Sequence, residues 1–568
     1  MMRPVNQSEN DAGPVEDDSY WEMLAGMMPD ADRPAGGGGS NPAGDEPSPT
    51  RRIRPNLIAV SEQDLLATLR DTFGFASFRP GQRDVIEAIL GGSDCLAVMP
   101  TGSGKSLTYQ LAARLLGGTT LVVSPLIALM KDQVDSARET GLKATFINSS
   151  LDPEERSLRI STLQQGGYEL VYVSPEGLAA SLRSVLTDVD VRLIAVDEAH
   201  CISQWGHDFR PDYRKLENLT ARFDVPVLAL TATATGRVRA DITTQLGLID
   251  PLEILNPFFR PNLKLRAYKK GTHDGKRIKA REQIGSYCRA KRGESGIVYT
   301  LSRNSAESTA QYLRSLGIKA AAYHAGLDAE TRSRVQDDFA RDDVHVVCAT
   351  VAFGMGIDKS NVRFVIHRDM PKSIESYYQE IGRAGRDGLD SDCILFYSWA
   401  DVVQLDRMVA SSESSVSQGR QIRRMYDFAE TISCRHAAIV GYFGDSIEPC
   451  DDSCDNCTDL GDELMLNKVA APAGHGSLDE SRPEDSELFE ELRSLRRELA
   501  DERGFPAYIV FSDATLREMA RLLPDNPTKL LAISGVGQKK LDSYGGAFLG
   551  LIEDWTRTNA RDGPISPG

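Results

Sequence analysis

The stretch MPTGSGKSLTYQ, residues 99–110, follows directly on a short apolar run and decides how the first half of the chain is read. Its two inner glycines let backbone N–H groups approach phosphate oxygens, Lys105 reaches the terminal phosphates, and Ser106 offers an oxygen to Mg²⁺. A helix that begins here adds the positive end of its dipole. Met99 replaces the usual first glycine, but a plain glycine-rich turn would not need Gly-Lys-Ser at this place. The candidate phosphate-binding residues are Gly102, Ser103, Gly104, Lys105 and Ser106.

Short apolar runs alternate with polar segments of helical length from about residue 60 to 400. Buried parallel strands have this composition, and the polar segments supply the crossovers between them. One series of runs comprises CLAVMP, TTLVVSP, ELVYVSPE, VRLIAVDEAH and VPVLALTAT. A second comprises SGIVYTLS, AAAYHAG, VHVVCAT, VRFVIH and CILFYS. The sequence therefore predicts two α/β domains, divided near residues 262–270.

Composition bounds the class of protein. The 568 residues are 41% hydrophobic and 26% charged, which indicates globular domains. No apolar run is long enough to cross a bilayer, and the first residues lack the apolar core of a signal peptide. Nine cysteines favour a reducing compartment. The net charge of −17 argues weakly against a nucleic-acid partner, yet residues 260–294 hold twelve basic and three acidic residues. This basic stripe is either a polyanion track or a solvated face.

Two later segments complete a candidate nucleotide-hydrolysing site. Asp197 and Glu198 end an apolar run, where one carboxylate can hold Mg²⁺ and its neighbour can orient the attacking water. In SIESYYQEIGRAGRDG, interpreted as a helix, Gln379, Arg383 and Arg386 fall on one face. Two guanidiniums on one face suit phosphate oxygens, and one can reach a γ-phosphate held by the other domain. The alternatives are surface charge and a salt-bridged helix.

The order of these motifs resembles that of RecQ-family DNA helicases of superfamily 2. The resemblance runs over residues 62–457 and 486–556, and it is carried by FGFASFRPGQ, MPTGSGKS, SPLIALMKDQV, VDEAHCISQWGHDFRP, LTATAT, AAYHAGL, ATVAFGMGIDK and QEIGRAGRDG. It implies ATP and Mg²⁺ as cofactors and two RecA-like domains. It also implies that HRDC, the C-terminal domain of many relatives, closes the chain.

The resemblance assigns further site residues. The segment after DEAH would be an aromatic-rich loop that senses single-stranded DNA, since exposed rings stack on any base. A set of core aromatics is the competing interpretation of Trp205, Phe209 and Tyr213. Residues implied in DNA coupling are His200, Gln204, Trp205, Phe209, Thr231 and Thr233, and those implied in nucleotide binding are Phe75 and Arg79 around the adenine, Gln82 on its edge, and Asp358.

Four cysteines stand close together in CRHAAIVGYFGDSIEPCDDSCDNC. Four thiolates at such spacing fit tetrahedral structural Zn²⁺, and buried free thiols are the alternative. The family carries a zinc-binding subdomain at this point. The candidate ligands are Cys434, Cys450, Cys454 and Cys457.

The C-terminal part departs from most relatives, which carry a winged-helix domain between the zinc module and HRDC. Here only a polar linker, residues 459–485, is present. The HRDC-like segment has more acids than bases, so strong autonomous DNA binding is doubtful and protein docking competes. Its Gly535-Val536-Gly537 turn, before Lys539 and Lys540, is a candidate phosphate contact. We expect HRDC to hold no residue of the ATP site.

The sequence therefore predicts an ATP-dependent 3′-to-5′ DNA helicase that unwinds tailed or forked duplexes in repair and recombination. A single-strand translocase and a DNA-annealing protein with weak unwinding are the alternatives. Protein partners would bind HRDC or the N-terminal extension, no membrane is involved, and the location is cytoplasmic, at the nucleoid in a bacterium. The expected parts are a disordered extension (1–58), two RecA-like parallel-sheet α/β domains (59–263, 264–405), a small helical zinc-binding subdomain (406–458), the linker (459–485), an all-α HRDC domain (486–558) and a tail (559–568).

Overall fold

The computed structural model describes the chain from a residue just before its first helix to the end of its last helix, with gaps. The expectations for the N-terminal extension, most of the linker and the tail fall outside the described residues. Described are residues 58–125, 127–180, 185–203, 209–217, 223–273, 276–353, 359–410, 415–458 and 483–559.

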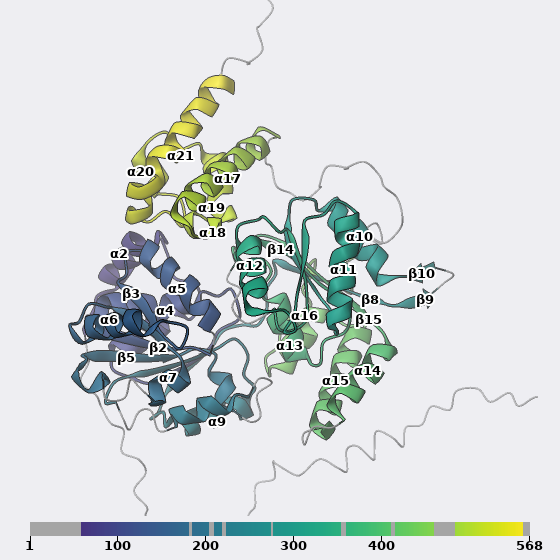
Figure 1. The fold of residues 1–568 in the computed structure, drawn as a ribbon, viewed down its shortest axis with the longest axis horizontal. Helices are drawn as coiled ribbons and strands as arrows, with labels where there is room; N and C mark the ends of the chain where they lie inside the picture. Colours follow the sequence, from purple (N-terminus) through teal and green to yellow (C-terminus); the bar gives the residue numbers. More distant parts are fainter. Residues whose placement is uncertain are drawn as a thin grey trace, which may run out of the picture. The chain divides into compact units, whose positions relative to one another are not determined.

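A seven-stranded parallel sheet forms the first of the two α/β domains (Figure 1). Five of its strands are the expected apolar runs. The sequence interpretation missed β3, which is only four residues long, and β7, an edge strand with one buried side chain. In spatial order the strands are β3 (Ala144–Ile147), β4 (Leu170–Val173), β2 (Thr119–Val123), β5 (Val191–Val196), β6 (Val227–Thr231), β1 (Cys95–Val98) and β7 (Leu252–Leu255).

Both faces of this sheet are buried, which is why its strands are continuous apolar runs. In β1, Leu96 and Val98 enter one hydrophobic cluster, whereas Cys95 and Ala97 enter the other. Crossover helices supply the covering side chains, and many begin at side-chain caps such as Ser61 before α2. The helices are α2 (Glu62–Phe73), α3 (Gln82–Leu90), α4 (Lys105–Leu116), α5 (Ile127–Glu139), α6 (Pro153–Gln164), α7 (Pro175–Ala180) and α9 (Gly236–Leu246).

A six-stranded parallel sheet forms the second α/β domain. Its edge strand β8 lies in the basic stripe and was missed, because Lys and Arg interrupt its apolar residues; it pairs with β15 over seven residues. A short antiparallel hairpin of β9 (Gly271–His273) and β10 (Lys276–Ile278) follows β8. The spatial order is β12 (Ala320–Tyr323), β13 (Val346–Ala349), β11 (Ser295–Tyr299), β14 (Val362–His367), β15 (Ser391–Tyr397) and β8 (Leu263–Lys269), with helices α10 (Ala280–Ala290), α11 (Arg303–Ser315), α12 (Ala329–Ala340) and α13 (Ile374–Ile381).

Six of the twelve basic residues of the stripe have acidic partners in the described part of the fold. Arg266 lies 2.9 Å from a carboxylate oxygen of Asp392 and is mostly buried. Lys270 contacts two carboxylates, at 3.1 and 2.8 Å. Among the described side chains of this segment, the paired bases favour an internally compensated surface over a continuous polyanion track. The other pairs are Lys264 with Asp390 and Asp452, Lys269 with Glu430, Lys279 with Glu282, and Lys291 with Glu294 and Asp392.

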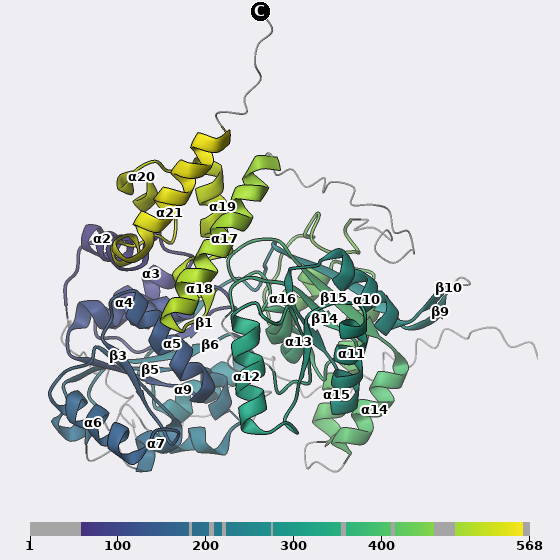
Figure 2. The ribbon, with the colours of Figure 1, turned by 45° about the horizontal axis from the view of Figure 1, so that its top comes forward.

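Two groups of helices follow the second sheet. The first group, α14 (Trp399–Val409), α15 (Ser415–Glu430) and α16 (Arg435–Tyr442), leads to the cysteine cluster. The second group has its own hydrophobic core. Its helices have the yellow-green to yellow colours of the C-terminal part of the chain in Figure 2. The predicted fold class is confirmed. The second group is α17 (Pro483–Arg503), α18 (Ala507–Val510), α19 (Asp513–Leu522), α20 (Pro527–Leu531) and α21 (Gln538–Asn559).

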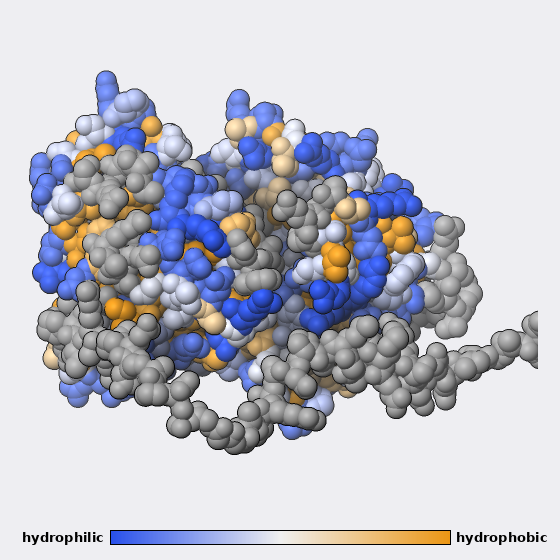
Figure 3. Space-filling model, turned by 90° about the horizontal axis from the view of Figure 1, so that it is seen from below, coloured by the Kyte–Doolittle hydropathy of each residue, from blue (hydrophilic) through white to orange (hydrophobic). Residues whose placement is uncertain are grey.

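Apolar side chains are mostly internal. On the face drawn in Figure 3, hydrophobic residues form separate patches among hydrophilic ones. Some large hydrophobics, such as Ile432 and Val416, are exposed, as single apolar residues on a protein surface normally are. Within the described ranges, no helix combines the length and the hydropathy that a bilayer crossing requires.

Candidate nucleotide site and cysteine cluster

The phosphate loop connects the end of β1 to the start of α4. Gly102 and Gly104 have φ values of 87° and 81°, a left-handed region that glycine enters without strain. A Cβ at Gly104 would lie 2.5 Å from Nε2 of the Gln82 side chain, so a larger residue here would also displace that side chain. Lys105 is the first residue of α4, and its Nζ donates to the carbonyl of Met99 at 3.1 Å.

The two predicted carboxylates follow β5, the strand two places from β1 in the sheet. The hydroxyl of Tyr213 donates to the carbonyl of Asp197 at 2.8 Å and fixes the chain at the strand end. Burial, together with the neighbouring charge of Glu198, raises the pKa of Asp197 to about 6. Glu198 itself adopts φ 48°, a strained value for a non-glycine residue. Tyr213 is fully buried, so the core interpretation is right for this aromatic.

A buried polar chain joins these carboxylates to the end of β6. Nδ1 of His200 lies 3.3 Å from a carboxylate oxygen of Glu198 and 2.9 Å from Oγ1 of Thr231. The Thr231 hydroxyl in turn donates to the carbonyl of Thr233 at 3.1 Å. A displacement of the segment after Glu198 therefore reaches the β6 loop through hydrogen bonds.

The arginine-bearing segment differs from its predicted helix. α13 ends at Ile381, and the residues after it form turns, so the prediction that Arg383 and Arg386 share a helix face with Gln379 was wrong. Glycines explain the early end. Gly385 has φ 56°, and a Cβ at Gly382 would lie 3.0 Å from Cβ of Thr101 in the phosphate loop. The turns nevertheless bring all three polar side chains to the same cavity.

Arg260 is a site residue that sequence reasoning missed. Its Nη1 donates to the carbonyls of Thr101 and Gly382, at 3.1 and 2.9 Å, and its Nη2 donates to those of Ala384 and Gly385, at 2.9 and 2.8 Å. The guanidinium thus ties the phosphate loop to the arginine-bearing turn of the other α/β domain. Burial lowers its pKa from the ordinary value. Arg260 begins the basic stripe, so nothing in the sequence distinguished it from the other basic residues there.

The adenine-recognition residues implied by the resemblance lie beside the phosphate loop. Nε2 of Gln82 donates to the carbonyls of Ser103 and Gly104, at 3.0 and 3.1 Å, and Oε1 accepts from the backbone N–H of Arg79 at 2.9 Å. The Arg79 guanidinium donates to the carbonyl of Gly102. Gln82 therefore links the segment that precedes α3 to the loop that would hold phosphates.

A single cavity of about 690 Å³ collects most of the predicted nucleotide residues, and this volume suits a nucleotide. Phe209, Thr231, Thr233 and Ser103 are not in its wall. Gln204, Trp205 and Asp358 lie outside the described residues. The predicted residues in the wall are Phe75, Arg79, Gln82, Gly102, Gly104, Lys105, Ser106, Asp197, Glu198, His200, Gln379, Arg383 and Arg386.

The C-terminal helices also contribute to the wall of this cavity, which the sequence interpretation did not anticipate. Ser512, Thr515 and Lys540 line it together with residues of the two α/β domains. The expectation for the glycine turn was wrong. The N–H of Gly535 donates to the carbonyl of Gly74 at 3.0 Å, so it is used by a protein contact in place of a phosphate. No local sequence signal marks such a contact between distant segments.

Two RecA-like sheets that share a cavity lined by a phosphate loop, paired carboxylates and arginines define an ATP-dependent helicase motor. Family models agree along the chain: DEAD/DEAH box helicase over residues 79–242, helicase conserved C-terminal domain over 277–388, RecQ zinc-binding over 399–458, and HRDC domain over 485–552.

Curated relatives identify the family within the helicases. The ATP-dependent DNA helicase RecQ of Haemophilus influenzae is 38% identical, with 87% of this chain and 96% of that protein covered. That of Bacillus subtilis is 36% identical, with 85% and 98% covered. The chain belongs to the RecQ family, and it is an ATP-dependent DNA helicase.

The relatives are longer within the aligned region. The alignment with the Haemophilus protein runs over 607 positions, more than the 568 residues of this chain. The relative therefore has residues that this chain lacks. The zinc-binding match ends at residue 458 and the HRDC match begins at 485, and the interval is too short for a further independently folded domain.

The four predicted cysteine ligands form one cluster. All four Sγ atoms lie within 4.8 Å of one another, and three of the cysteines are buried. Cys434 caps α16 by accepting from the N–H of Ala437, and Cys454 makes a β-bridge to Leu265 of β8. Four converging thiols with no disulfide fit one tetrahedral Zn²⁺, which would join α16 to the second sheet.

Replacing Cys454 with Ser is expected to lower the zinc content from about one ion per chain. The melting temperature should fall as well, because the free energy of zinc binding stabilises the folded state. Elemental analysis and thermal unfolding measure the two effects. Cys288→Ser is the matched control: this buried thiol lies in α10, outside the cluster, so zinc content should stay at the wild-type value. A folded wild-type protein without zinc would contradict the assignment.

Proposed function

We propose that the protein moves 3′ to 5′ along single-stranded DNA and unwinds tailed or forked duplexes in DNA repair and recombination. The observation that carries the proposal is the cavity whose wall comes from the phosphate loop and DEAH segment of one motor domain and the arginine-bearing turn of the other. A nucleotide held there touches both domains, so each hydrolysis event changes their mutual attraction. We place this activity in the cytoplasm, at the nucleoid in a bacterium, where its DNA substrate lies.

The first motor domain supplies the groups that bind and cleave ATP. Lys105 and the N–H groups of the phosphate loop hold the β- and γ-phosphates. Ser106 and Asp197 would hold Mg²⁺, which neutralises phosphate charge when bound. Glu198 orients and deprotonates the attacking water, and its strained backbone keeps the carboxylate at the strand end. Phe75 and Arg79 enclose the adenine, and Gln82 turns its amide to the base edge.

The second motor domain supplies charge for the transition state. Arg383 and Arg386 stabilise the negative charge that develops on the γ-phosphate. Gln379 helps to position either these arginines or the phosphate itself. Asp358 helps to place the nucleotide between the domains. Because Arg260 joins this turn to the phosphate loop through four carbonyls, the arginines stay next to the site.

DNA binding is coupled to hydrolysis through the segment after the DEAH box. Trp205 and Phe209 stack on bases, and the Phe209 ring already lies 5.5 Å from the guanidinium carbon of Arg214. His200 and Gln204 transmit movement of this segment to Glu198. The hydrogen bond of His200 to Thr231 carries the same movement to Thr233 and the interdomain side of the sheet.

A second candidate function is a single-strand translocase or annealing protein with weak unwinding. The short interval between the zinc-binding and HRDC matches favours it, because the interval is too short for a separate folded domain that would grip the duplex. Protein partners bind the HRDC domain or the N-terminal extension in this proposal.

Lys105→Ala is expected to reduce ATP turnover by at least about 100-fold, because it removes a preorganised charge from the phosphates. DNA binding should remain, since the side chain contacts phosphates of the nucleotide. Steady-state hydrolysis and fluorescence anisotropy with single-stranded DNA test both. The matched control is Lys143→Ala, an exposed lysine of the same domain, which should turn over like wild type. Near-normal turnover by Lys105→Ala would refute the site assignment.

Trp205→Ala is expected to abolish most of the DNA-stimulated hydrolysis and to leave basal hydrolysis nearly intact, because each stacked base contributes ~1–3 kcal/mol of binding. Turnover with and without single-stranded DNA measures the ratio. Trp399→Ala is the control, since this tryptophan is half-exposed on α14 and packs on Tyr426. Equal loss of both rates in Trp205→Ala would indicate a core residue.

A duplex with a 3′ single-stranded tail is expected to unwind faster than a 5′-tailed or blunt duplex of the same sequence, because the motor must first hold a single strand. Affinity should follow the same order, with a shallow salt dependence on blunt duplex, where few phosphates are contacted. Strand-displacement assays and salt titrations measure these quantities. ATP turnover without displacement of any tailed duplex would favour the translocase.

A further inference from the structure

The HRDC domain, here α17–α21, contacts the first motor domain through closely packed backbone. The N–H of Gly535 donates to the carbonyl of Gly74, the residue that ends α2. A Cβ on Gly537 would lie 3.1 Å from the carbonyl oxygen of Thr72 and 3.3 Å from the nitrogen of Gly74. The Tyr544 hydroxyl donates to a carboxylate oxygen of Glu139 at 2.7 Å. Two backbones this close leave no room for a side chain between them.

The same domain contacts the second motor domain through charge. Arg493 of α17 lies 3.9 Å from Asp342, and its Nη2 donates to the carbonyl of Gly293 at 3.4 Å. One turn further on, Arg497 pairs with Asp343. Asp342 is buried and also receives Lys359 at 2.7 Å. The attachment therefore reaches a lysine that directly follows the proposed nucleotide-positioning segment of this motor domain.

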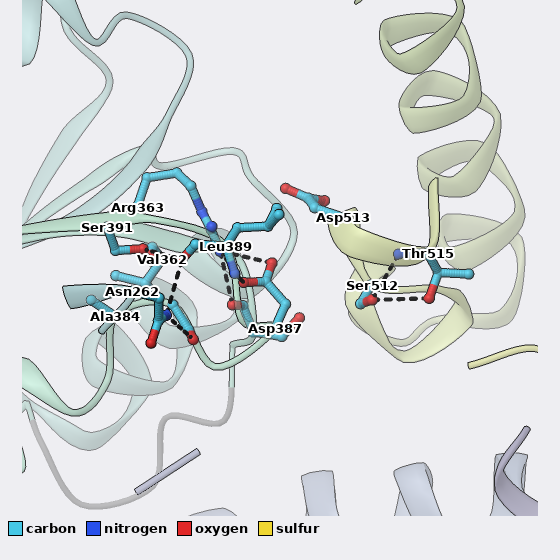
Figure 4. Close-up of polar contacts among 12 residues, drawn as sticks. Asn262, Val362, Arg363, Ala384, Asp387, Leu389, Ser391, Ser512, Asp513 and Thr515 are labelled. Carbon is cyan, nitrogen blue, oxygen red and sulfur yellow. Dashed lines mark hydrogen bonds and ion pairs between the residues drawn. The ribbon is translucent and has the colours of Figure 1, made fainter. Parts of the chain in front are cut away.

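A third contact region faces the arginine-bearing turn. Asp513, at the start of α19, is oriented toward the pair of Arg363 and Asp387 (Figure 4). Arg363 holds Asp387 at 2.6 and 2.7 Å, and Asp513 pairs with Arg496 of its own domain at 2.7 Å. Burial raises the pKa of Asp513, but the charges of Arg496, Arg493 and Arg363 outweigh it and hold the pKa below its usual range. The carboxylate thus faces positive charge from both sides of the contact.

These contacts fall on both sides of the nucleotide cavity, and Ser512, Thr515 and Lys540 form part of its wall. We propose that the HRDC domain is a built-in brake: by holding both motor domains at once, it restrains the opening and closing of the cleft that each ATP turnover requires. Because the HRDC domain is attached to both motor domains, it must detach from one of them before the two motor domains can separate. The proposal rests on the ATP-driven domain motion proposed above, and it gives the HRDC domain a role within the chain that needs no DNA.

The test releases each side separately in the full-length protein. Gly537→Leu places a side chain against the first motor domain, and the control Gly550→Leu adds the same side chain to α21 at a site with no described atom within 4 Å. Arg493→Glu combined with Arg497→Glu repels Asp342 and Asp343. Its control is Arg521→Glu with Arg557→Glu, which changes the charge equally at exposed positions; Arg557 pairs within its own helix.

Hydrogen exchange of the Gly535 amide reports docking independently of activity, because its acceptor belongs to the motor domain. Gly537→Leu is expected to exchange this amide faster, and both test variants are expected to raise basal ATP turnover by about fivefold or more, whereas both controls match wild type. Unchanged exchange in Gly537→Leu would show that the domain is not docked in solution. Faster exchange with unchanged or reduced turnover would overturn the brake. If the wild type hydrolysed no ATP, the proposed motor function would fail while the exchange result still reported docking.

Discussion

The Arg260 guanidinium is the interaction on which the site depends. It donates to four backbone carbonyls, which belong to the phosphate loop on one motor domain and to the arginine-bearing turn on the other. Carbonyls at the ends of loops need donors when they are buried, and one planar group with five N–H donors satisfies four of them at once. The same geometry brings Gly382 against Thr101, where a Cβ would lie 3.0 Å from Cβ of Thr101, tighter than an ordinary contact. The cavity exists because these two loops are held together.

The carboxylate side of the cavity is organised by a different set of forces. Tyr213 fixes the strand end through the carbonyl of Asp197, and His200 connects Glu198 to Thr231. All of these side chains except the two carboxylates are buried, so the hydrogen bonds cannot be exchanged for water without cost. In the proposed mechanism, a base that displaces the segment after Glu198 moves His200 and, through it, Glu198 and Thr231, which would couple DNA binding to hydrolysis.

The HRDC domain changes how the motor is understood. In the sequence it is a separate helical module with a net acidic charge, and its natural interpretation is a binding domain for DNA or protein. In the structure its glycine turn packs on α2, and its first helix pairs with acids of the second motor domain. A domain that lines the nucleotide cavity has the position needed to set the rate of the motor.

The sequence by itself determined the parallel sheets, because strands buried on both faces are continuous apolar runs, and it determined the phosphate loop, the carboxylate pair and the four cysteines, because each depends on residue type at short spacing. It failed at β8, whose basic residues have partners far along the chain, and at the helix expected through Arg383, which Gly382 and Gly385 end early. Only the tertiary structure decided the bridging position of Arg260 and the docking of the HRDC domain. Both consist of contacts between segments distant in the chain. The acceptors of Arg260 and of the Gly535 N–H are backbone carbonyls, and a carbonyl has the same chemistry at every residue and so leaves no local mark in the sequence.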